Sequence, residues 1–210
     1  ASHEFRAPLA NIEVATQLLE LEPGRKEATA ILARIRRATQ RLSNFVDNCL
    51  TKERMDTDGW LLHEEAIELE RLLEEAMEQT RQLAPERALR LATTRQASQL
   101  RGDVQLLKVL LHNLLDNAFK YSPADSPVEL GTELTAQGGL SLWVRDQGGG
   151  IEPAELDGIF GKFYRSAGVG SVAGAGLGLF LVAKIAELHQ ARVHVESRPG
   201  AGSRFTVTFP

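Results

Sequence analysis

Glycine is distributed very unevenly along this chain of 210 residues. Three of its 18 glycines lie before residue 130, and all the others lie after it. Glycine weakens helices and strands but permits tight turns and close approaches of the backbone, because it has no Cβ. We therefore predict two different kinds of polypeptide joined end to end: a helical part that is poor in glycine, and a second part whose loops carry the glycines.

Residues 1–57 are predicted to form a helical hairpin that dimerises. The stretch LEPGRK at 21–26 is a turn signal between two segments whose seam positions recur at alternating steps of four and three, as in a coiled coil. One hairpin leaves such a stripe half covered, whereas a four-helix bundle of two chains would close it, so we expect a homodimer. The seam positions are Phe5, Leu9, Ile12, Thr16 and Leu19 in the first segment, and Ile31, Ile35, Ala38, Leu42, Phe45 and Cys49 in the second.

His3 lies, in this repeat, on the side of the first helix farthest from the seam. An imidazole at that position is exposed, titratable and within reach of another domain. By this geometry alone, a surface histidine without a role is the simpler interpretation, so further residues are needed before His3 is given a function.

Charge and hydropathy argue against two broad classes of protein. The chain has 24 Lys and Arg against 28 Asp and Glu, and its isoelectric point is near 5.8. This balance argues against a protein held to nucleic acid by bulk charge. There is no run of 18 apolar residues, so we expect no transmembrane helix within this sequence. The single cysteine, Cys49, cannot form an internal disulfide.

The second part is predicted to be an α/β domain over 63–210, joined to the hairpin by a linker at 58–62. Alternating, β-branched or aromatic stretches predict short strands, and apolar periodicity predicts helices between them. The connections are too irregular for a doubly wound fold, so we expect a two-layer α/β sandwich with one sheet covered on one face. The predicted strands are 88–94, 128–134, 140–145, 191–197 and 204–209, and the predicted helices are 64–83, 103–121 and 176–189.

Two common phosphate-binding motifs fail on their spacing. A Walker A loop needs Ser or Thr after Gly-Lys, but Phe163 follows Gly161 and Lys162. A dinucleotide fingerprint that begins at Gly174 needs a glycine at position 179, where this chain has leucine. If this chain binds a nucleotide, it therefore uses a phosphate-binding element other than these two motifs.

The helix predicted over 103–121 carries a polar face. Asn113 and Asn117 are one turn apart and Lys120 follows near the same face. An amide oxygen suits Mg²⁺ and an ammonium group suits a phosphate oxygen. A polar helix face in water explains the same residues, so this element alone is weak.

Two glycine-rich elements follow within 70 residues. In VRDQGGGIEP (144–153), Asp146 ends a strand before three glycines, where a carboxylate could accept from an exocyclic amine. In GAGLGLF (174–180), glycines run into a helix whose first N–H groups favour an anion. Each stretch is also explained by an ordinary glycine-rich turn, but the three elements in this order point to a nucleotide site.

These stretches together resemble the motifs of bacterial sensor histidine kinases, and the resemblance extends over residues 2–209. It implies a HisKA-type dimerisation and phosphotransfer hairpin, followed by an ATP-binding domain of the Bergerat fold. The matching stretches are SHEFRAPL (2–9) for the H-box, 110–122 for the N-box, Asp146 to Gly150 for the DxGxG box, IFGKFYR (159–165) for the F-box, GAGLGL (174–179) for the second glycine box, and GAGSRF (200–205) before the last strand.

The resemblance also implies roles for individual residues. His3 is implied as the phosphoacceptor, Glu4 as the carboxylate that orients and activates it, and Asn117 with Asn113 as the Mg²⁺ ligands. Asp146 would recognise the adenine amine. The implied ATP-binding residues are Asn113, Asn117, Lys120, Tyr121, Asp146, Gly148, Gly150, Phe160, Phe163, Arg165, Gly174, Gly176, Leu177 and Gly178, with a mobile lid over 164–173.

The implied activity is ATP-dependent autophosphorylation of His3, followed by phosphotransfer to an aspartate of a response-regulator receiver domain. The resemblance further implies a parent protein anchored in the bacterial inner membrane, with this portion in the cytoplasm. Ala7 departs from the family pattern, which usually has Thr or Asn four residues after the histidine to orient a hydrolytic water. We therefore expect weak or absent phosphatase activity. The alternatives are a non-catalytic module that dimerises with another histidine kinase and regulates it, and an ATPase or clamp protein of the same nucleotide fold.

Overall fold

The structure of this chain, a computed structural model, describes residues 2–21, 24–55, 62–93, 99–136, 138–164 and 176–210. The described residues form two compact units, one made by the first two helices and the other by all the remaining elements. The predicted linker at 58–62 falls outside the described residues except for Leu62.

The first unit is the predicted helical hairpin. It consists of α1 (Ser2–Glu20) and α2 (Arg25–Met55), and α1 continues through Pro8. Ala15 is fully buried, whereas Thr16, which the heptad spacing places on the seam, is exposed. The contact between the two helices of one chain therefore uses a stripe of α1 beside the predicted seam, and the seam with a second chain stays a prediction.

Several large apolar side chains of the hairpin are exposed in the single chain. Leu9 is a predicted seam residue and half of its surface is exposed. Such a position is expected to be exposed in one chain if a second chain covers it. The other exposed large apolar residues of these helices and their turn are Val14, Leu18, Leu21, Leu32 and Leu50.

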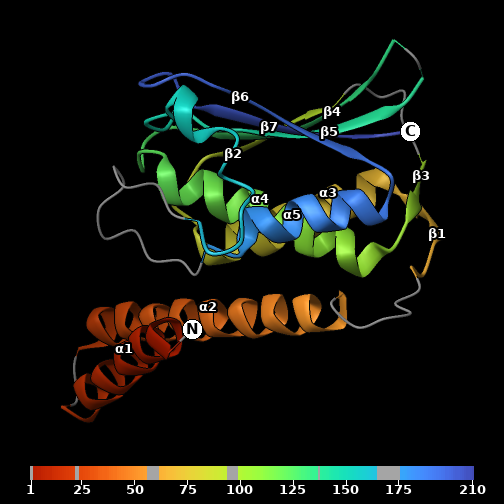
Figure 1. Cartoon of the computed structure of the whole chain (residues 1–210). Helices are drawn as coiled ribbons and strands as arrows, with labels where there is room; N and C mark the ends of the chain where they lie inside the picture. Colours follow the sequence, from red (N-terminus) through yellow and green to blue (C-terminus); the bar gives the residue numbers. More distant parts are fainter. Residues whose placement is uncertain (1, 22–23, 56–61, 94–98, 137, 165–175) are drawn as a thin grey trace. The chain divides into compact units, whose positions relative to one another are not determined.

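The second unit contains a five-stranded sheet in the order β2-β4-β5-β7-β6 (Figure 1). Strand β2 is parallel to β4, and each of the other neighbouring pairs is antiparallel. All five strands predicted from the sequence are confirmed, with ends that differ by at most one residue. Their bounds are β2 (Leu89–Thr93), β4 (Val128–Leu134), β5 (Leu140–Arg145), β6 (Arg192–Ser197) and β7 (Ser203–Phe209).

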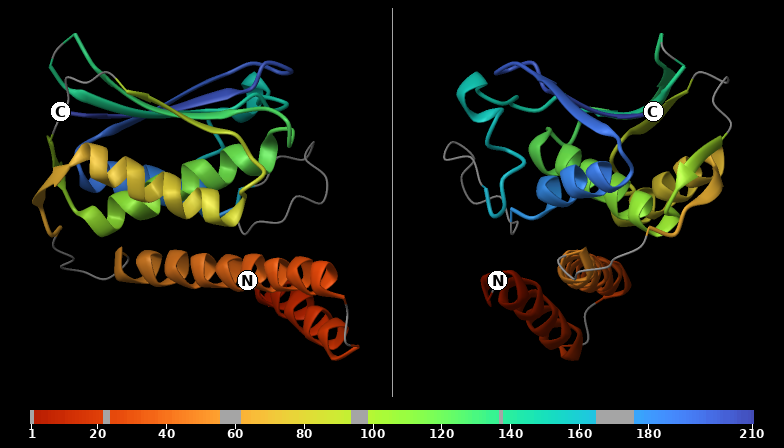
Figure 2. Two further views of the ribbon diagram at one scale, coloured as in Figure 1. Left: turned by 180° about the vertical axis from the view of Figure 1, so that it is seen from behind. Right: turned by 45° about the vertical axis from the view of Figure 1, so that its right-hand side comes forward.

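Three helices, α3 (Leu69–Leu83), α4 (Val104–Tyr121) and α5 (Gly178–Leu188), cover one face of this sheet, as both views in Figure 2 show. The expected two-layer sandwich is therefore confirmed. None of the described helices is long and apolar enough to cross a membrane. The core between the layers includes the fully buried side chains of Leu72, Leu107, Leu110, Leu111, Leu114, Leu130, Leu142, Leu181 and Ile185.

A second, two-stranded sheet differs from the sequence-based prediction. Strand β1 (Glu65–Glu68) pairs antiparallel with β3 (Gln99–Gly102), so the helix predicted from residue 64 begins only at Leu69. Ile67 lies opposite Leu100, and both side chains are buried. Pairing with a segment more than thirty residues away therefore overrides the local helical periodicity of 64–68.

The start of α4 is held by side chains from two parts of the chain. Asp103 caps the helix, because its Oδ1 accepts from the N–H groups of Gln105 and Leu106 at 3.0 and 3.2 Å. The N–H of Asp103 donates to Nε2 of the buried His189 at 3.0 Å, and Nδ1 of His189 donates to the carbonyl of Ile185 at 2.7 Å. His189 thus joins the start of α4 to the end of α5.

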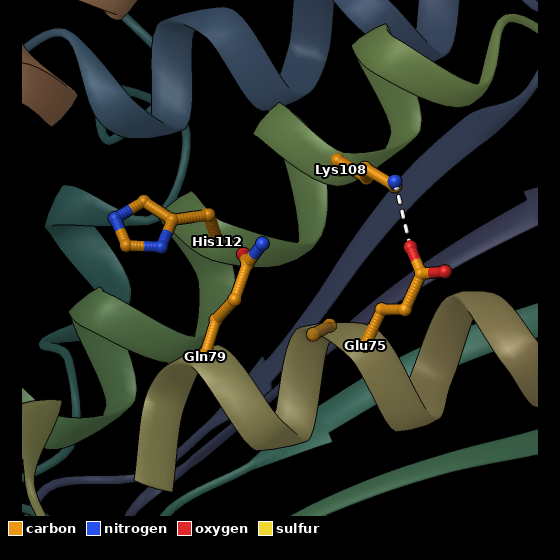
Figure 3. A pocket seen from close by; sticks show the side chains of 5 residues that line it. Glu75, Gln79, Lys108 and His112 are labelled. Carbon is orange, nitrogen blue, oxygen red and sulfur yellow. Dashed lines mark ion pairs between the residues drawn. The ribbon is translucent and has the colours of Figure 1, made fainter. Parts of the chain in front are cut away.

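An ion pair joins α3 to α4 beside the shallow hollow in Figure 3, and a second ion pair lies within α3. Lys108 Nζ lies 2.7 Å from Glu75 Oε2, and Arg71 Nε lies 2.9 Å from Glu75 Oε1. Hydrogen bonds from Lys108 and Arg71 hold the pKa of the Glu75 carboxyl below its usual value. His112 and Gln79 line the same hollow, one turn beyond the ion pair on each helix.

Candidate nucleotide site

The predicted phosphoacceptor pair lies at the beginning of the hairpin. His3 and Glu4 belong to the first turn of α1. Two other predicted residues, Arg165 and Gly174, fall outside the described residues, as does most of the predicted lid. The remaining predicted site residues all belong to the second unit.

Asn113 connects α4 to the beginning of α5. Its Nδ2 donates to the carbonyl of Val109 at 2.8 Å, which directs Oδ1 to the other side of the side chain. A Cβ on Gly178 would lie 2.9 Å from that Oδ1. The amide oxygen of Asn113 therefore lies against the first residue of α5. Asn117 follows one turn later and is half buried.

Lys120 is paired with a residue that the sequence analysis did not select. Its Nζ lies 2.6 Å from Oδ2 of Asp116, one turn earlier on α4, and both side chains are partly exposed. An exposed pair of this kind contributes little to stability. Lys120 is therefore available to another anion at a small energetic cost.

The C-terminus of α4 is held by Arg87, which lies in the connection between α3 and β2. Its guanidinium donates to the carbonyl of Phe119 at 3.1 Å and to the hydroxyl of Ser122 at 2.8 Å. It also stacks on the Phe119 ring, with Cζ 4.8 Å from the centroid. A cation at a helix C-terminus is favourable because it faces the negative end of the helix dipole. Arg87 thereby fixes the turn that carries Lys120 and Tyr121.

Asp146 follows β5 and is a deeply buried carboxylate with 4% of its surface exposed. Its Oδ1 accepts from the N–H of Gly148 at 2.7 Å, and the backbone of Ser203 also hydrogen-bonds to the carboxylate. Burial nevertheless raises the pKa of this carboxyl above its ordinary value, since the two backbone hydrogen bonds only partly offset the loss of water. An ionised carboxylate has more acceptor positions than these two donors fill.

The loop after Asp146 lies directly on the end of α4. A Cβ on Gly148 would lie only 2.2 Å from the carbonyl oxygen of Tyr121, so a residue with a side chain cannot occupy this position without a shift of the backbone. Tyr121 itself is 44% exposed. The aromatic ring and the buried carboxylate are thus brought to one region by this backbone contact.

The beginning of α5 presents backbone N–H groups. Leu177 is buried and precedes the helix, Gly176 has a positive φ of 67°, and no side chain among the described residues caps this end. The first N–H groups of an uncapped helix, together with the helix dipole, attract an anion. Gly178 is the first residue of the helix and contacts Asn113 as described above.

The F-box residues lie beside this helix end. Phe163 has φ of 62°, is 59% exposed, and donates from its backbone N–H to the carbonyl of Gly176 at 3.0 Å. Lys162 Nζ lies 5.7 Å from the Phe163 ring centroid and 5.9 Å from that of Phe180 in the first turn of α5. Phe160 is half buried. These contacts tie one end of the predicted lid to α5.

The donor set fits ATP and Mg²⁺. A buried carboxylate with spare acceptor positions suits an exocyclic amine, while a helix N-terminus and a lysine suit phosphates. Among the residues that the structure describes, no three or more His, Cys, Asp and Glu side chains gather into a metal site. Amide oxygens such as those of Asn113 and Asn117, completed by phosphate oxygens and water, are an ordinary environment for Mg²⁺.

Sequence reasoning missed three residues of this region: Arg87, Asp116 and Ser197. Arg87 and Ser197 contact parts of the chain more than thirty residues away, so no spacing pattern marks them. Asp116 is different, because its position one turn before Lys120 is visible in the sequence as an i, i+4 ion pair.

Two family models match the chain. Residues 102–210 match the model described as "Histidine kinase-, DNA gyrase B-, and HSP90-like ATPase". Residues 1–58 match the model described as "His Kinase A (phospho-acceptor) domain".

Relatives cover the whole chain. It is 34% identical over 212 residues to the sensor protein kinase PmrB of Pseudomonas aeruginosa, covering all of this chain and 44% of that protein. It is 32% identical over 212 residues to the sensor protein QseC of Escherichia coli K12, covering all of this chain and 46% of that protein. The chain thus spans less than half the length of these curated relatives.

Solved structures resemble the chain as well. Full-length ShkA in complex with AMPPNP matches with a TM-score of 0.70 and 25% identity, over all of this chain and 44% of that one. The mycobacterial sensor histidine kinase MprB matches with a TM-score of 0.64 and 28% identity, over 70% of this chain and 97% of that one.

Proposed function

This chain belongs to the sensor histidine kinases, a branch of the histidine kinase-, DNA gyrase B- and HSP90-like ATPases, and from that membership we propose that it is the kinase core of a two-component system. It would use ATP to phosphorylate His3 and pass the phosphoryl group to an aspartate of a response-regulator receiver domain. The phosphoacceptor model covers the hairpin and the ATPase model covers most of the second unit.

The observation that supports this proposal most directly is that α4 contacts two elements of opposite chemistry. Its C-terminus touches the Gly148 loop, which holds the buried Asp146 carboxylate. One face of its middle, at Asn113, touches the uncapped N-terminus of α5. One helix therefore connects an acceptor for a base amine to a set of donors for phosphates. ATP needs both, because its base carries an amine and its phosphates are anionic.

In this proposal Asp146 accepts a hydrogen bond from the adenine amine, and Tyr121 packs beside the base. The N–H groups at the start of α5 and the Lys120 ammonium group bind phosphate oxygens. Asn117 and Asn113 hold Mg²⁺, which supplies neutralisation of charge on the transferring phosphoryl group. Arg165 and Gly174 are proposed for the phosphates from their motif positions alone.

The transfer step needs a neutral imidazole. A ring nitrogen of His3 forms the N–P bond as the bond between the γ-phosphorus and the bridging oxygen breaks and ADP leaves. Glu4 holds the ring in the reactive tautomer and takes up the proton that the imidazole loses. Phosphohistidine formed in this way is labile in acid and stable in base.

The partners proposed are a second copy of the chain and a receiver domain. The exposed apolar side chains of α1 and α2, such as Leu9 and Leu18, support a dimer through the hairpin. The names of the curated relatives, which are sensor proteins and sensor kinases, support the receiver domain as acceptor.

The test is incubation of the dimer with Mg²⁺ and γ-labelled ATP, followed by acid and base treatment of the protein. We expect label that is lost in acid, retained in base, and absent from His3→Gln. A parent chain that dimerises and binds ATP but takes up no label would contradict the kinase and favour a regulatory module. Label that survives in His3→Gln would place the phosphoacceptor elsewhere.

A further inference from the structure

Ser197, the last residue of β6, lies where the β6–β7 turn meets the loop after β5. Its hydroxyl makes three contacts of 2.9 Å: with the N–H of Ile151, the carbonyl of Gly202 and the hydroxyl of Ser203. Ile151 is 46 residues away in the sequence, so the contact joins two distant segments.

The direction of each hydrogen bond follows from the single proton of the Ser197 hydroxyl. That proton is donated to the carbonyl of Gly202, which cannot itself donate. The Ser203 hydroxyl must then donate to Ser197, and the N–H of Ile151 donates to Ser197 as well. The Ser197 oxygen is therefore fully used, with two donors and one acceptor around it.

The loop and the turn are also fastened by their backbones. The N–H of Gly200 donates to the carbonyl of Gly149 at 2.7 Å, and the N–H of Asp146 donates to the carbonyl of Ser203 at 2.9 Å. A Cβ on Gly202 would lie 2.1 Å from the carbonyl oxygen of Asp146. There is no space for the loop to approach the turn further. The hydroxyl of Ser197 acts together with these backbone hydrogen bonds to keep the loop from moving away.

We propose that Ser197 is a positioning residue for recognition of the nucleotide base. Its hydroxyl holds the loop of residues 148–151 against the β6–β7 turn. Through Ser203 it also fixes the position of the buried Asp146 carboxylate relative to the base. It thereby controls both the affinity for ATP and the preference for a base that carries a 6-amino group. This inference rests on the proposed function, because it takes Asp146 as the residue that meets the adenine amine.

Base selectivity separates this role from a general contribution to folding. Inosine triphosphate (ITP) differs from ATP at the 6-position, where an oxygen replaces the amine, and at N1, which carries a proton. A carboxylate that faces the 6-substituent therefore attracts adenine and repels the 6-oxygen of hypoxanthine. A carboxylate that moves more freely discriminates less. Ser197→Ala should weaken ATP binding about tenfold, the loss expected for one to two hydrogen bonds, and should reduce the ATP-to-ITP preference by a similar factor.

The experiment measures the dissociation constants of ATP and ITP by calorimetry on the 210-residue chain, and the melting temperature without nucleotide. The variants are Ser197→Ala, Ser197→Thr, Ser203→Ala and, as matched control, Ser141→Ala. Ser141 is a buried serine of the same sheet, and its hydroxyl bonds to that of Thr208 at 2.8 Å instead of to the loop. Both alanine variants lose a hydrogen-bonded hydroxyl, from a half-buried serine at 197 and from a buried serine at 141, but only Ser197 is bonded to the loop and to Ser203.

We expect Ser197→Ala to lose affinity and selectivity, Ser197→Thr to retain both, and Ser141→Ala to lower the melting temperature without changing selectivity. Ser203→Ala removes one donor from the same network and is expected to give a smaller loss, which keeps the test available if Ser197→Ala does not fold. The inference is overturned if Ser197→Ala has the same ATP-to-ITP preference as the parent. It is also overturned if Ser141→Ala loses as much of that preference as Ser197→Ala does. A parent that binds neither nucleotide contradicts the proposed function itself and is recognised before any variant is compared.

Discussion

Replacing Asp146 by asparagine separates its role in base recognition from its effect on stability. The carboxylate is almost completely buried, and burial raises the pKa of its carboxyl above the ordinary value. Asparagine has the same shape and is neutral, but it has an amide NH₂ group in place of one oxygen. The substitution therefore removes the acceptor for the adenine amine and also removes a buried charge.

The expected changes in binding and stability have opposite signs. A hydrogen bond to a charged group contributes about 1.5–3 kcal/mol. In the variant the amide NH₂ group would also face the adenine amine, and two donors that face each other add to the loss. The expected loss of binding free energy is about 2–4 kcal/mol, which raises the ATP dissociation constant roughly 30- to 1000-fold. Because the folded pKa is raised, ionisation of Asp146 lowers stability, and this cost appears as the pH rises from the unfolded pKa through the folded pKa. The Asp146→Asn variant should thus melt no lower than the parent at neutral pH, and its relative advantage should vanish in acid.

The assay is a double-mutant cycle between the side chain and the base. Dissociation constants of ATP and ITP are measured on the parent and on Asp146→Asn, together with melting curves at acidic and neutral pH. ATP binding should weaken strongly in the variant, whereas ITP binding should weaken little or improve, because the amide can donate to the 6-oxygen. Equal weakening of both nucleotides would refute the reasoning, since it would mean that Asp146 supports the loop without meeting the base. A neutral-pH melting temperature well below that of the parent would refute the stability argument.

Three other substitutions test different parts of the molecule. Arg87→Ala should destabilise the second unit by about 2–4 kcal/mol in chemical denaturation, because three hydrogen-bonding groups at the end of α4 lose their donor, and Arg87→Lys should recover little of this loss. Gly178→Ala should weaken ATP binding, because its Cβ would lie 2.9 Å from the Asn113 amide oxygen. Gly24→Ala in the hairpin is the control, since its Cβ would make only an ordinary contact of 3.5 Å with Glu27 Oε2. Ala7→Thr should accelerate dephosphorylation of a phosphorylated receiver domain, measured by loss of label. Rapid dephosphorylation by the parent chain would contradict the prediction that Ala7 leaves it with weak phosphatase activity.

Local patterns in the sequence predicted most elements correctly. The period of the apolar residues identified α2, α4 and α5, and alternation or β-branched and aromatic content identified all five strands of the main sheet. The helix cap at Asp103 is local as well, since it involves residues two and three positions later. Motif order also predicted which residues form the nucleotide site, and those roles remain predictions that the experiments above address.

The failures of local reasoning have one physical cause. The residues 65–68 have helical periodicity but form β1, because pairing with β3 buries Ile67 opposite Leu100. In the hairpin, the contact within one chain buries Ala15, whereas the predicted seam with a second chain, which includes Thr16, stays a prediction. In both regions a partner outside the segment determines which residues are buried, and a local period does not contain that information.

The local patterns of this sequence are enough to predict its two kinds of polypeptide, the order of most of its elements and a set of candidate residues for a nucleotide site. Which groups hold these residues in place depends on how the strands and helices pack. Ser197 meets Ile151 across 46 positions, and Arg87 reaches Phe119 across 32. A propensity or a spacing acts over a few residues along one element, whereas a contact of this kind depends on how the strands and helices pack. The glycines near these contacts, including Gly148 and Gly202, are required by the close approach of two backbones, and the folded chain alone specifies which backbones those are.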